Sequence, residues 1–200
     1  MNAADFVYLA SGSPRRRELL QQIGVSFRVI GIELDETALA GEVSSVYVER
    51  LAAAKAAAGW QQSRGLREAP VLAADTAVVL DGRILGKPRD MKDAISMLLE
   101  LSGRTHDVLT AVALRAAAGT QLKVSRSRVT FRSIDAAEAR DYWATGEPLG
   151  KAGAYAIQGY AAVFIADLEG SYSGVMGLPL FETAQLLEAA GIGRWRHDEH

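Results

Sequence analysis

Val71-Leu-Ala-Ala-Asp-Thr-Ala-Val-Val-Leu80 is a run of apolar residues interrupted near its centre by one carboxylate. The length of the run and the turn signal Asp81-Gly82 behind it predict a buried strand that enters a hairpin, with a second arm from Arg83 to Gly86. An unpaired carboxylate in such a strand costs several kcal/mol. Asp75 therefore needs a cation, hydrogen-bond donors or water, either in a structural ion pair or as a metal ligand or general base.

Strand-like and helix-like segments alternate on both sides of this run, which predicts an α/β fold. The 200 residues fit a single domain with a frayed tail over 194–200. Further strands are expected at 6–10, 25–30, 107–116, 121–131, 154–158 and 162–168. Helices are expected from Ser13-Pro14 to Gly24, from Ser44 to Ala58 with Gly59 as the C-cap, from Asp90 to Leu101, from Asp135 to Gly146 and from Leu180 to Ala190.

The composition argues against several classes of protein. A net charge of -2 without blocks of like charge disfavours nucleic acid and membrane surfaces as partners. No apolar run is long enough to span a membrane, and the run from Phe6 to Ala10 is too short for a signal peptide, so a cytoplasmic protein is expected. The chain has no cysteine and only 3 histidines, which leaves the carboxylates and lysines to carry any reaction.

A second informative stretch, Ser11-Gly-Ser-Pro-Arg15, joins the first strand to the first helix and continues with two more arginines. Cations at a helix N-terminus are mildly unfavourable unless an anion lies among them. Free backbone N–H groups and the hydroxyls of Ser11 and Ser13 complete what a phosphate site requires. The alternative is a solvated basic helix end.

Two lysines and an acidic loop offer further charges. Lys55 lies in an alanine-rich helix, so its ammonium must reach the helix rim or an anion. Lys87 lies between Gly86 and Pro88, where a compact charge suits phosphate oxygens or is simply solvated. The stretch Glu33-Leu-Asp-Glu36 supplies carboxylates either for a magnesium site or for a solvated loop.

The segment Lys151-Ala-Gly-Ala-Tyr-Ala-Ile-Gln-Gly159 combines two glycines, an aromatic ring and an amide. Gln158 offers both a donor and an acceptor, as recognition of a pyrimidine edge requires. A buried amide satisfied by the backbone is the alternative.

In order and spacing, these segments together resemble the Maf family of nucleotide pyrophosphatases from about Tyr8 to Leu187. The matching pieces are Leu9-Ala-Ser-Gly-Ser-Pro-Arg-Arg16, Ala74-Asp-Thr76, Gly86-Lys-Pro-Arg-Asp90, Leu101-Ser-Gly-Arg-Thr-His106, the segment 151–159 and Gly177-Leu-Pro-Leu180. The resemblance implies a Maf/ITPase-like α/β fold, with a mixed central sheet flanked by helices and two lobes with a substrate cleft between them. It also implies a homodimer.

The activity implied by the resemblance is that of a hydrolase acting on acid anhydrides. Such an enzyme needs Mg²⁺ or Mn²⁺ and cleaves a nucleoside triphosphate between the α and β phosphates. Asp75 matches the family's proton acceptor, and Arg15, Thr76 and Gln158 fall on positions that select the substrate in the dTTP/UTP branch. A sister branch active on 7-methyl-GTP has Ser-Glu-Gly where this chain has Ile157-Gln-Gly159. The sequence thus sides with dTTP, UTP or modified pyrimidine nucleotides.

The expected division of labour follows from these matches. Asp75 and Glu36 hold the metal and a water that attacks the α-phosphorus, and Lys55 and Lys87 neutralise the charge that develops on the phosphates. The remaining substrate-binding residues are Ser11, Ser13, Arg15, Thr76 and Gln158.

One position departs from the family pattern, because Gly150 stands where an acidic residue usually precedes Lys-Ala-Gly-Ala-Tyr. Loss of that carboxylate is expected to weaken metal binding or slow turnover. The missing carboxylate also fits an alternative, a nucleotide-sensing regulator, for instance of cell division, that binds triphosphate without turnover. A general phosphatase that releases orthophosphate is a third alternative.

Overall fold

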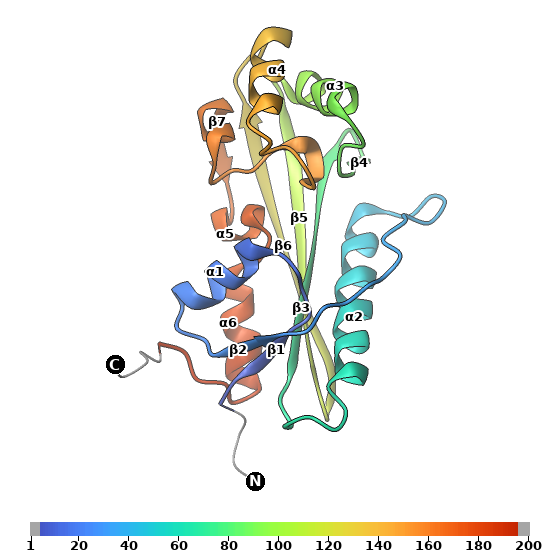
Figure 1. The fold of residues 1–200 in the computed structure, drawn as a ribbon, viewed down its shortest axis with the longest axis vertical. Helices are drawn as coiled ribbons and strands as arrows, with labels where there is room; N and C mark the ends of the chain where they lie inside the picture. The colour runs from blue at the N-terminus through green and yellow to red at the C-terminus, as the bar shows by residue number, and fades with distance from the viewer. Residues whose placement is uncertain (1–4, 196–200) are drawn as a thin grey trace.

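The computed structural model describes residues 5–195 and contains one seven-stranded mixed sheet (Figure 1). The strand order is β2-β1-β3-β5-β6-β7, and β4 pairs with β3. The short strands β1 and β2 run parallel to each other and β1 runs parallel to β3, whereas the other pairs are antiparallel. The strands are β1 Val7–Leu9, β2 Phe27–Val29, β3 Val71–Leu80, β4 Arg83–Leu85, β5 Thr105–Ala116, β6 Gly119–Phe131 and β7 Ile165–Glu169. The predicted α/β class with a mixed sheet is confirmed.

Helices cover both faces of the sheet. They are α1 Pro14–Gln22, α2 Ser44–Gln62, α3 Met91–Leu101, α4 Ala136–Ala144, α5 Tyr172–Met176 and α6 Leu180–Ala189, with the 3-10 helices η1 Ala152–Ala154 and η2 Tyr160–Phe164. In Figure 1, α2 lies on one side of the long strands, α1 and α6 lie on the other, and α3 and α4 cover the far end. None of the helices between residues 5 and 195 is both long and apolar enough to cross a membrane.

The pleat of β3 divides its side chains between the two faces of the sheet. Val71, Ala73 and Ala77 pack with the buried alanines of α2 in one core cluster. Leu72 and Ala74 pack on the opposite face with leucines of α1 and α6. Asp75 is therefore expected on the α2 side and Thr76 on the α1 side.

The edge of β3 that faces β1 is open in its middle. β1 pairs with β3 at Val71 and Leu72, and β4 pairs with it only from Val78 onward, whereas β5 pairs along the whole opposite edge. On this edge, between β1 and β4, no strand of the described chain pairs with residues 73–77. The chain thus leaves a gap at the part of β3 that carries Asp75 and Thr76.

Several helix boundaries agree with the capping signals in the sequence. The Asp90 carboxylate accepts a hydrogen bond from the Asp93 backbone N–H and starts α3. Asp135 likewise accepts from the backbone N–H groups of Ala137 and Glu138 and starts α4. The Glu138 side chain bonds Arg132 instead of returning to the N-cap, so the cap is not reciprocal.

The predicted end of the second helix is wrong, because α2 continues through Gly59 to Gln62. Gly59 lies where α2 meets the sheet, and a Cβ there would lie 2.7 Å from Cγ1 of Val71 and 3.0 Å from Cβ of Ala10. The glycine permits close packing of the helix on the sheet and does not terminate the helix.

The predicted strand at 154–158 is also wrong. Gly153 and Ala154 both have positive φ, +66° and +59°, which no strand accommodates, and the segment forms η1 followed by a turn. The strand expected at 162–168 begins as η2 and becomes β7 only at Ile165. At the chain end, the Trp195 N–H donates to the carbonyl of Ile23, and residues 196–200 of the predicted tail lie outside the described residues.

Replacing Gly59 by alanine is expected to destabilise the fold by about 1–3 kcal/mol, because the added methyl group overpacks the contact with β1 and β3. Helix propensity alone predicts the opposite, a gain of about 1 kcal/mol. Chemical denaturation of Gly59→Ala measures the difference. The matched control is Ala57→Gly on the exposed face of the same helix, which should lose about 1 kcal/mol through propensity alone. A more stable Gly59→Ala protein would contradict the packing role.

Candidate active site

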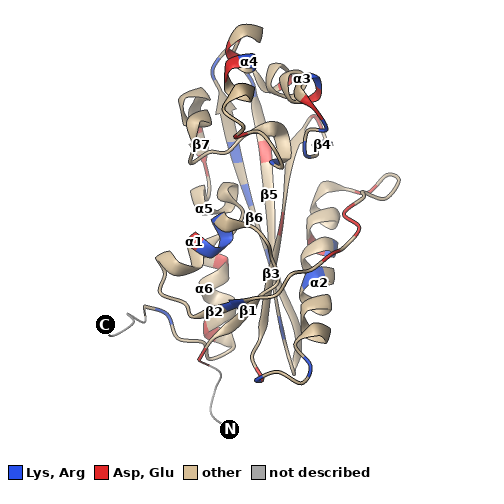
Figure 2. Ribbon diagram, in the orientation of Figure 1, with Lys and Arg blue, Asp and Glu red and all other residues tan. Residues whose placement is uncertain are grey.

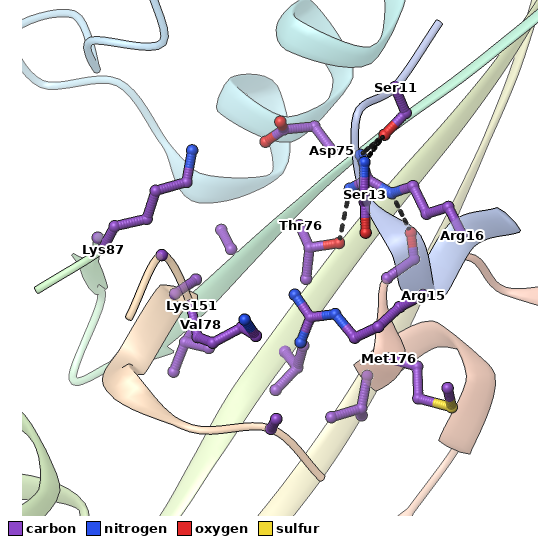
Figure 3. A pocket seen from close by; sticks show the side chains of 18 of the residues that line it. Ser11, Ser13, Arg15, Arg16, Asp75, Thr76, Val78, Lys87, Lys151 and Met176 are labelled. Atoms are coloured by element: carbon purple, nitrogen blue, oxygen red, sulfur yellow. Dashed lines mark hydrogen bonds between the residues drawn. The ribbon is translucent and has the colours of Figure 1, made fainter. Parts of the chain in front are cut away.

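A pocket of about 880 Å³ opens at the gap in the edge of β3 (Figure 3). It is bounded by the loop after β1, the loop that precedes α2, the residues after β4 and the segment between α4 and η2. All the site residues expected from the sequence line this single pocket: Ser11, Ser13, Arg15, Glu36, Lys55, Asp75, Thr76, Lys87 and Gln158.

Asp75 and Lys55 form a buried ion pair beside the pocket. The ammonium nitrogen lies 2.7 Å from Oδ1 of the carboxylate, and the two residues are only 6% and 9% exposed. Lys55 reaches β3 because its helical neighbours Ala52 and Ala56 are small and pack directly on the sheet. Burial raises the pKa of Asp75, and the nearby charges of Lys55 and Arg16 oppose that rise.

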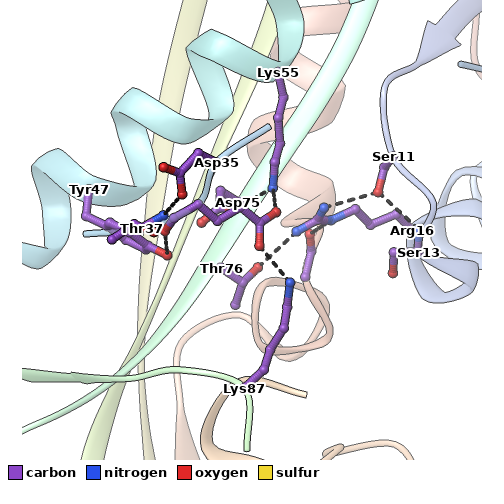
Figure 4. Close-up of polar contacts among 12 residues, drawn as sticks. Ser11, Ser13, Arg16, Asp35, Thr37, Tyr47, Lys55, Asp75, Thr76 and Lys87 are labelled. Atoms are coloured by element: carbon purple, nitrogen blue, oxygen red, sulfur yellow. Dashed lines mark hydrogen bonds and ion pairs between the residues drawn. The ribbon is translucent and has the colours of Figure 1, made fainter. Parts of the chain in front are cut away.

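Glu36 extends this pair into a row of alternating charges. Figure 4 shows Asp75, Lys55 and Lys87 of this row. Its two carboxylate oxygens accept hydrogen bonds from Lys55 at 2.5 Å and from Lys87 at 2.6 Å. Burial pushes the pKa of Glu36 upward, but the hydrogen bonds from the two lysines outweigh it and lower the pKa to about 2. Asp75, Lys55, Glu36 and Lys87 thus form a row in which carboxylates and ammonium groups alternate.

The loop that carries Glu36 is fastened to α2. The Tyr47 hydroxyl donates to the Glu36 carbonyl at 3.0 Å. Arg50 donates to the Thr37 carbonyl and pairs with the Glu42 carboxylate at 2.6 Å. These contacts hold the loop over the pocket, so the Glu36 carboxylate faces Lys55 and Lys87.

On the other face of β3, Arg16 joins three segments of the chain. Its guanidinium donates from Nε to the Gly177 carbonyl at 2.7 Å, from Nη1 to the Ser11 hydroxyl at 3.2 Å and from Nη2 to the Thr76 hydroxyl at 3.4 Å. Burial lowers the pKa of Arg16, and the Asp75 charge opposes the shift. In Figure 2 the basic residues at the start of α1 and within α2 lie on opposite sides of β3.

Arg15 and Lys151 also extend into the pocket (Figure 3). Burial lowers the pKa of both, and for Lys151 the Arg15 charge lowers it further. Among the described residues, neither has a carboxylate within ion-pairing distance. Two cations without counter-ions make this side of the pocket attractive to an anion.

Ser13 and Gln158 present polar groups to the same space. The Ser13 backbone N–H donates to the Ser11 hydroxyl at 3.2 Å, and the Ser13 side chain does not cap α1. Gln158 is exposed, and its side-chain amide forms no hydrogen bond within residues 5–195. The alternative of an amide satisfied by the backbone is therefore wrong for Gln158.

The carboxylates fit a metal that arrives with its substrate. No group of three or more His, Asp or Glu side chains placed to hold a metal ion together occurs within residues 5–195. Mg²⁺ is commonly bound by one or two carboxylates together with substrate phosphates and water. Asp75 and Glu36, which share Lys55 as a partner, are two carboxylates on the pocket wall that such a site would use.

The family model for Maf-like proteins matches residues 6–190. The chain belongs to the Maf family. A dTTP/UTP pyrophosphatase from Aromatoleum aromaticum is 55% identical, covering 92% of this chain and 95% of the relative. A dTTP/UTP pyrophosphatase from Saccharophagus degradans is 51% identical, covering 98% of this chain and 93% of the relative. The structure of the Staphylococcus aureus Ham1 protein aligns with a TM-score of 0.41 at 17% identity, over 65% of this chain and 72% of that one.

Arg16 is a pocket cation of this Maf-family chain to which the sequence patterns assigned no role of its own. A signal for it exists in the helix period. Leu19 and Leu20, three and four residues further on, are the buried residues of α1, so Arg16 lies on the same inward face. The Gly177 carbonyl, which accepts a hydrogen bond from Arg16, is 161 residues away along the chain, and no sequence pattern predicts that contact.

Replacing Arg16 by lysine is expected to lower the free energy of unfolding by about 2–3 kcal/mol, because an ammonium cannot make the three hydrogen bonds of the guanidinium at once. Urea denaturation measures the loss. The matched control is Arg17→Lys, one residue along α1, whose side chain makes no hydrogen bond or ion pair with the described residues and should stay within about 0.5 kcal/mol. Equal losses of unfolding free energy in the two variants would show that the three hydrogen bonds of Arg16 have no structural role.

Proposed function

We propose that this chain is a nucleoside triphosphate pyrophosphatase that hydrolyses dTTP and UTP, or modified pyrimidine nucleotides, to the monophosphate and pyrophosphate. The observation that carries the proposal is the row Asp75, Lys55, Glu36 and Lys87, which runs from a buried ion pair to an exposed lysine along the wall of a pocket that Arg15 also lines. Relatives that are 51% and 55% identical over nearly the whole chain and are named dTTP/UTP pyrophosphatase support it.

The cations bind the triphosphate in this scheme. Phosphoryl transfer needs mainly positioning and neutralisation of charge on the phosphate oxygens. Lys55 and Lys87 supply that charge on the α2 side of the pocket, and Arg15 supplies it on the α1 side. The hydroxyls of Ser11 and Ser13, with the N-terminus of α1, complete the phosphate contacts.

Asp75 is the proton acceptor. Burial raises the pKa of its carboxyl group, which makes the carboxylate a stronger base, and the Lys55 ammonium favours the ionised form. It orients a water and takes its proton as the water attacks the α-phosphorus. A bound Mg²⁺ or Mn²⁺ held by Asp75 and Glu36 supplies Lewis-acid stabilisation of the phosphate charge.

Base selection falls to Gln158 and Thr76. The Gln158 amide has both a donor and an acceptor without partners among the described residues, which suits the edge of a pyrimidine. Thr76 lies beside Thr110, with 3.0 Å between their hydroxyl oxygens, so the position of its hydroxyl is fixed. Fixed polar groups discriminate between bases better than mobile ones, because a wrong base leaves them unpaired.

Gly150 lies on the pocket wall with a φ of +68°, a conformation that favours glycine, and a Cβ there would meet no atom within 4 Å. We infer that metal binding uses Asp75 and Glu36 without a third carboxylate at this position. We also propose that the chain is a single cytoplasmic domain of two lobes, that the substrate enters between them, and that two copies form a homodimer.

The direct test is to incubate purified protein with UTP or dTTP, with and without Mg²⁺ or Mn²⁺, and to identify the products. Monophosphate and pyrophosphate, formed only with metal, are expected. Orthophosphate would instead identify a general phosphatase. Tight binding without products would identify a nucleotide-sensing regulator.

Replacing Asp75 by asparagine is expected to lower kcat by about 10²–10⁴-fold, because the amide cannot accept the proton. Circular dichroism should show the native fold. The control Asp107→Asn alters a carboxylate on β5 that pairs with Arg126 outside the pocket and should leave kcat unchanged. A fully active Asp75→Asn protein would remove Asp75 from the mechanism.

A further inference from the structure

Gln158 lies at the tip of a tight turn whose position is set from outside the turn. The Gly159 N–H donates to the Ala156 carbonyl at 3.0 Å and closes the turn. The Gln158 side chain forms no hydrogen bond within the described residues, so it contributes nothing to holding the turn in place. Whatever fixes the backbone on both sides of the turn therefore determines where the amide points.

Glu147 binds the backbone that follows the turn. Its carboxylate accepts hydrogen bonds from the Tyr160 N–H at 3.0 Å and from the Ala161 N–H at 3.2 Å. These two N–H groups belong to the first turn of η2, which has no other side-chain cap. Glu147 thus anchors the start of η2 directly behind Gln158.

Tyr142 connects the same carboxylate to the backbone that precedes the turn. Its hydroxyl donates to Oε1 of Glu147 at 2.7 Å and accepts from the Ala156 N–H at 3.3 Å. Burial raises the pKa of Tyr142, and the hydrogen bond to Glu147 raises it further, so the hydroxyl remains a donor over the ordinary pH range. The Tyr142 ring packs edge to face on Phe164 of η2, with 5.1 Å between ring centroids.

Gly159 leaves room for this arrangement. A Cβ at this position would lie 1.9 Å from Oε2 of Glu147. Any side chain there would displace the carboxylate from the two N–H groups. The close approach explains the glycine after Gln158 without any contact to a ligand.

The charge around Glu147 argues against a role as a counter-ion. Glu147 lines the pocket with Arg15 and Lys151, but it has no cation within 4.0 Å among the described residues. Its hydrogen bonds go to two main-chain N–H groups and one hydroxyl instead. Glu147 therefore serves to hold the backbone at Tyr160 and Ala161, although two cations line the same pocket.

We propose that Glu147, acting with Tyr142, is a positioning residue for base recognition: it clamps the backbone on both sides of Gln158 and so presents the amide to the base. The inference rests on the proposed function, in which Gln158 contacts the base. Glu147 contributes to specificity and to KM through this turn, and the phosphate subsite at Lys55 and Lys87 works independently of it.

The test compares wild type with Glu147→Gln and Tyr142→Phe. Glu147→Gln places an N–H donor against main-chain N–H groups and should release the turn. We expect the KM for UTP to rise about tenfold or more, with the ratio of kcat/KM for UTP over ATP falling by a similar factor. Tyr142→Phe should change both quantities in the same direction but less. Inorganic tripolyphosphate, which has no base, should inhibit all three proteins equally.

Glu49→Gln, an exposed change on α2 outside the pocket, is the matched control and should behave as wild type. A Glu147→Gln or Tyr142→Phe protein with unchanged KM and base preference would overturn the inference. So would a parallel loss of tripolyphosphate inhibition, since that would indicate a general structural role. A failure of the proposed function is distinguishable from a failure of this inference, because in that case the wild-type protein itself would hydrolyse no pyrimidine triphosphate.

Discussion

The buried pairing of Asp75 with Lys55 is the constraint on which the rest of the site depends. A carboxylate in the middle of an apolar strand needs a cation, hydrogen-bond donors or water, and here Lys55 is the cation, at 2.7 Å. Replacing buried ion pairs by apolar residues often stabilises a protein. The pair is therefore poor evidence for stability. The pair requires an alanine-rich helix, because only small neighbours let Lys55 approach the sheet closely. Lys55 also pairs with Glu36, which holds the loop before α2 beside the pocket.

The sheet makes this pair accessible by leaving part of one strand edge free. β1 and β4 are only three residues each and flank the open stretch of β3, while β5 supports the opposite edge throughout. Asp75 and Thr76 point to opposite faces of the sheet, yet both line the pocket because it opens at this edge. Charges carried by α2 and by α1 thus meet around one cavity.

The sequence predicted the features that local chemistry determines. Asp75 inside the apolar run 71–80 was expected to need a cation, hydrogen-bond donors or water, and Lys55 in its alanine-rich helix was expected to reach the helix rim or an anion. The structure selects the ion pair between them. Gly59 was misread as a cap because its reason is a contact with Val71 and Ala10 across the fold. The segment 154–158 was misread as a strand, since the positive φ of Ala154 and the hydrogen bond from the Ala156 N–H to the Tyr142 hydroxyl leave no periodic signal. Arg16 was missed because its partners lie up to 161 residues away.

A double-mutant cycle on Lys55 and Asp75 tests the central claim most directly. The free energy of unfolding is measured for wild type, Lys55→Met, Asp75→Asn and the double variant. Lys55→Met alone should cost about 3–5 kcal/mol, because it leaves a buried carboxylate without its partner. The double variant should recover most of that loss, giving a coupling energy of at least about 1 kcal/mol. Losses that add to within about 0.5 kcal/mol would contradict the account, because the two charges would then not depend on each other.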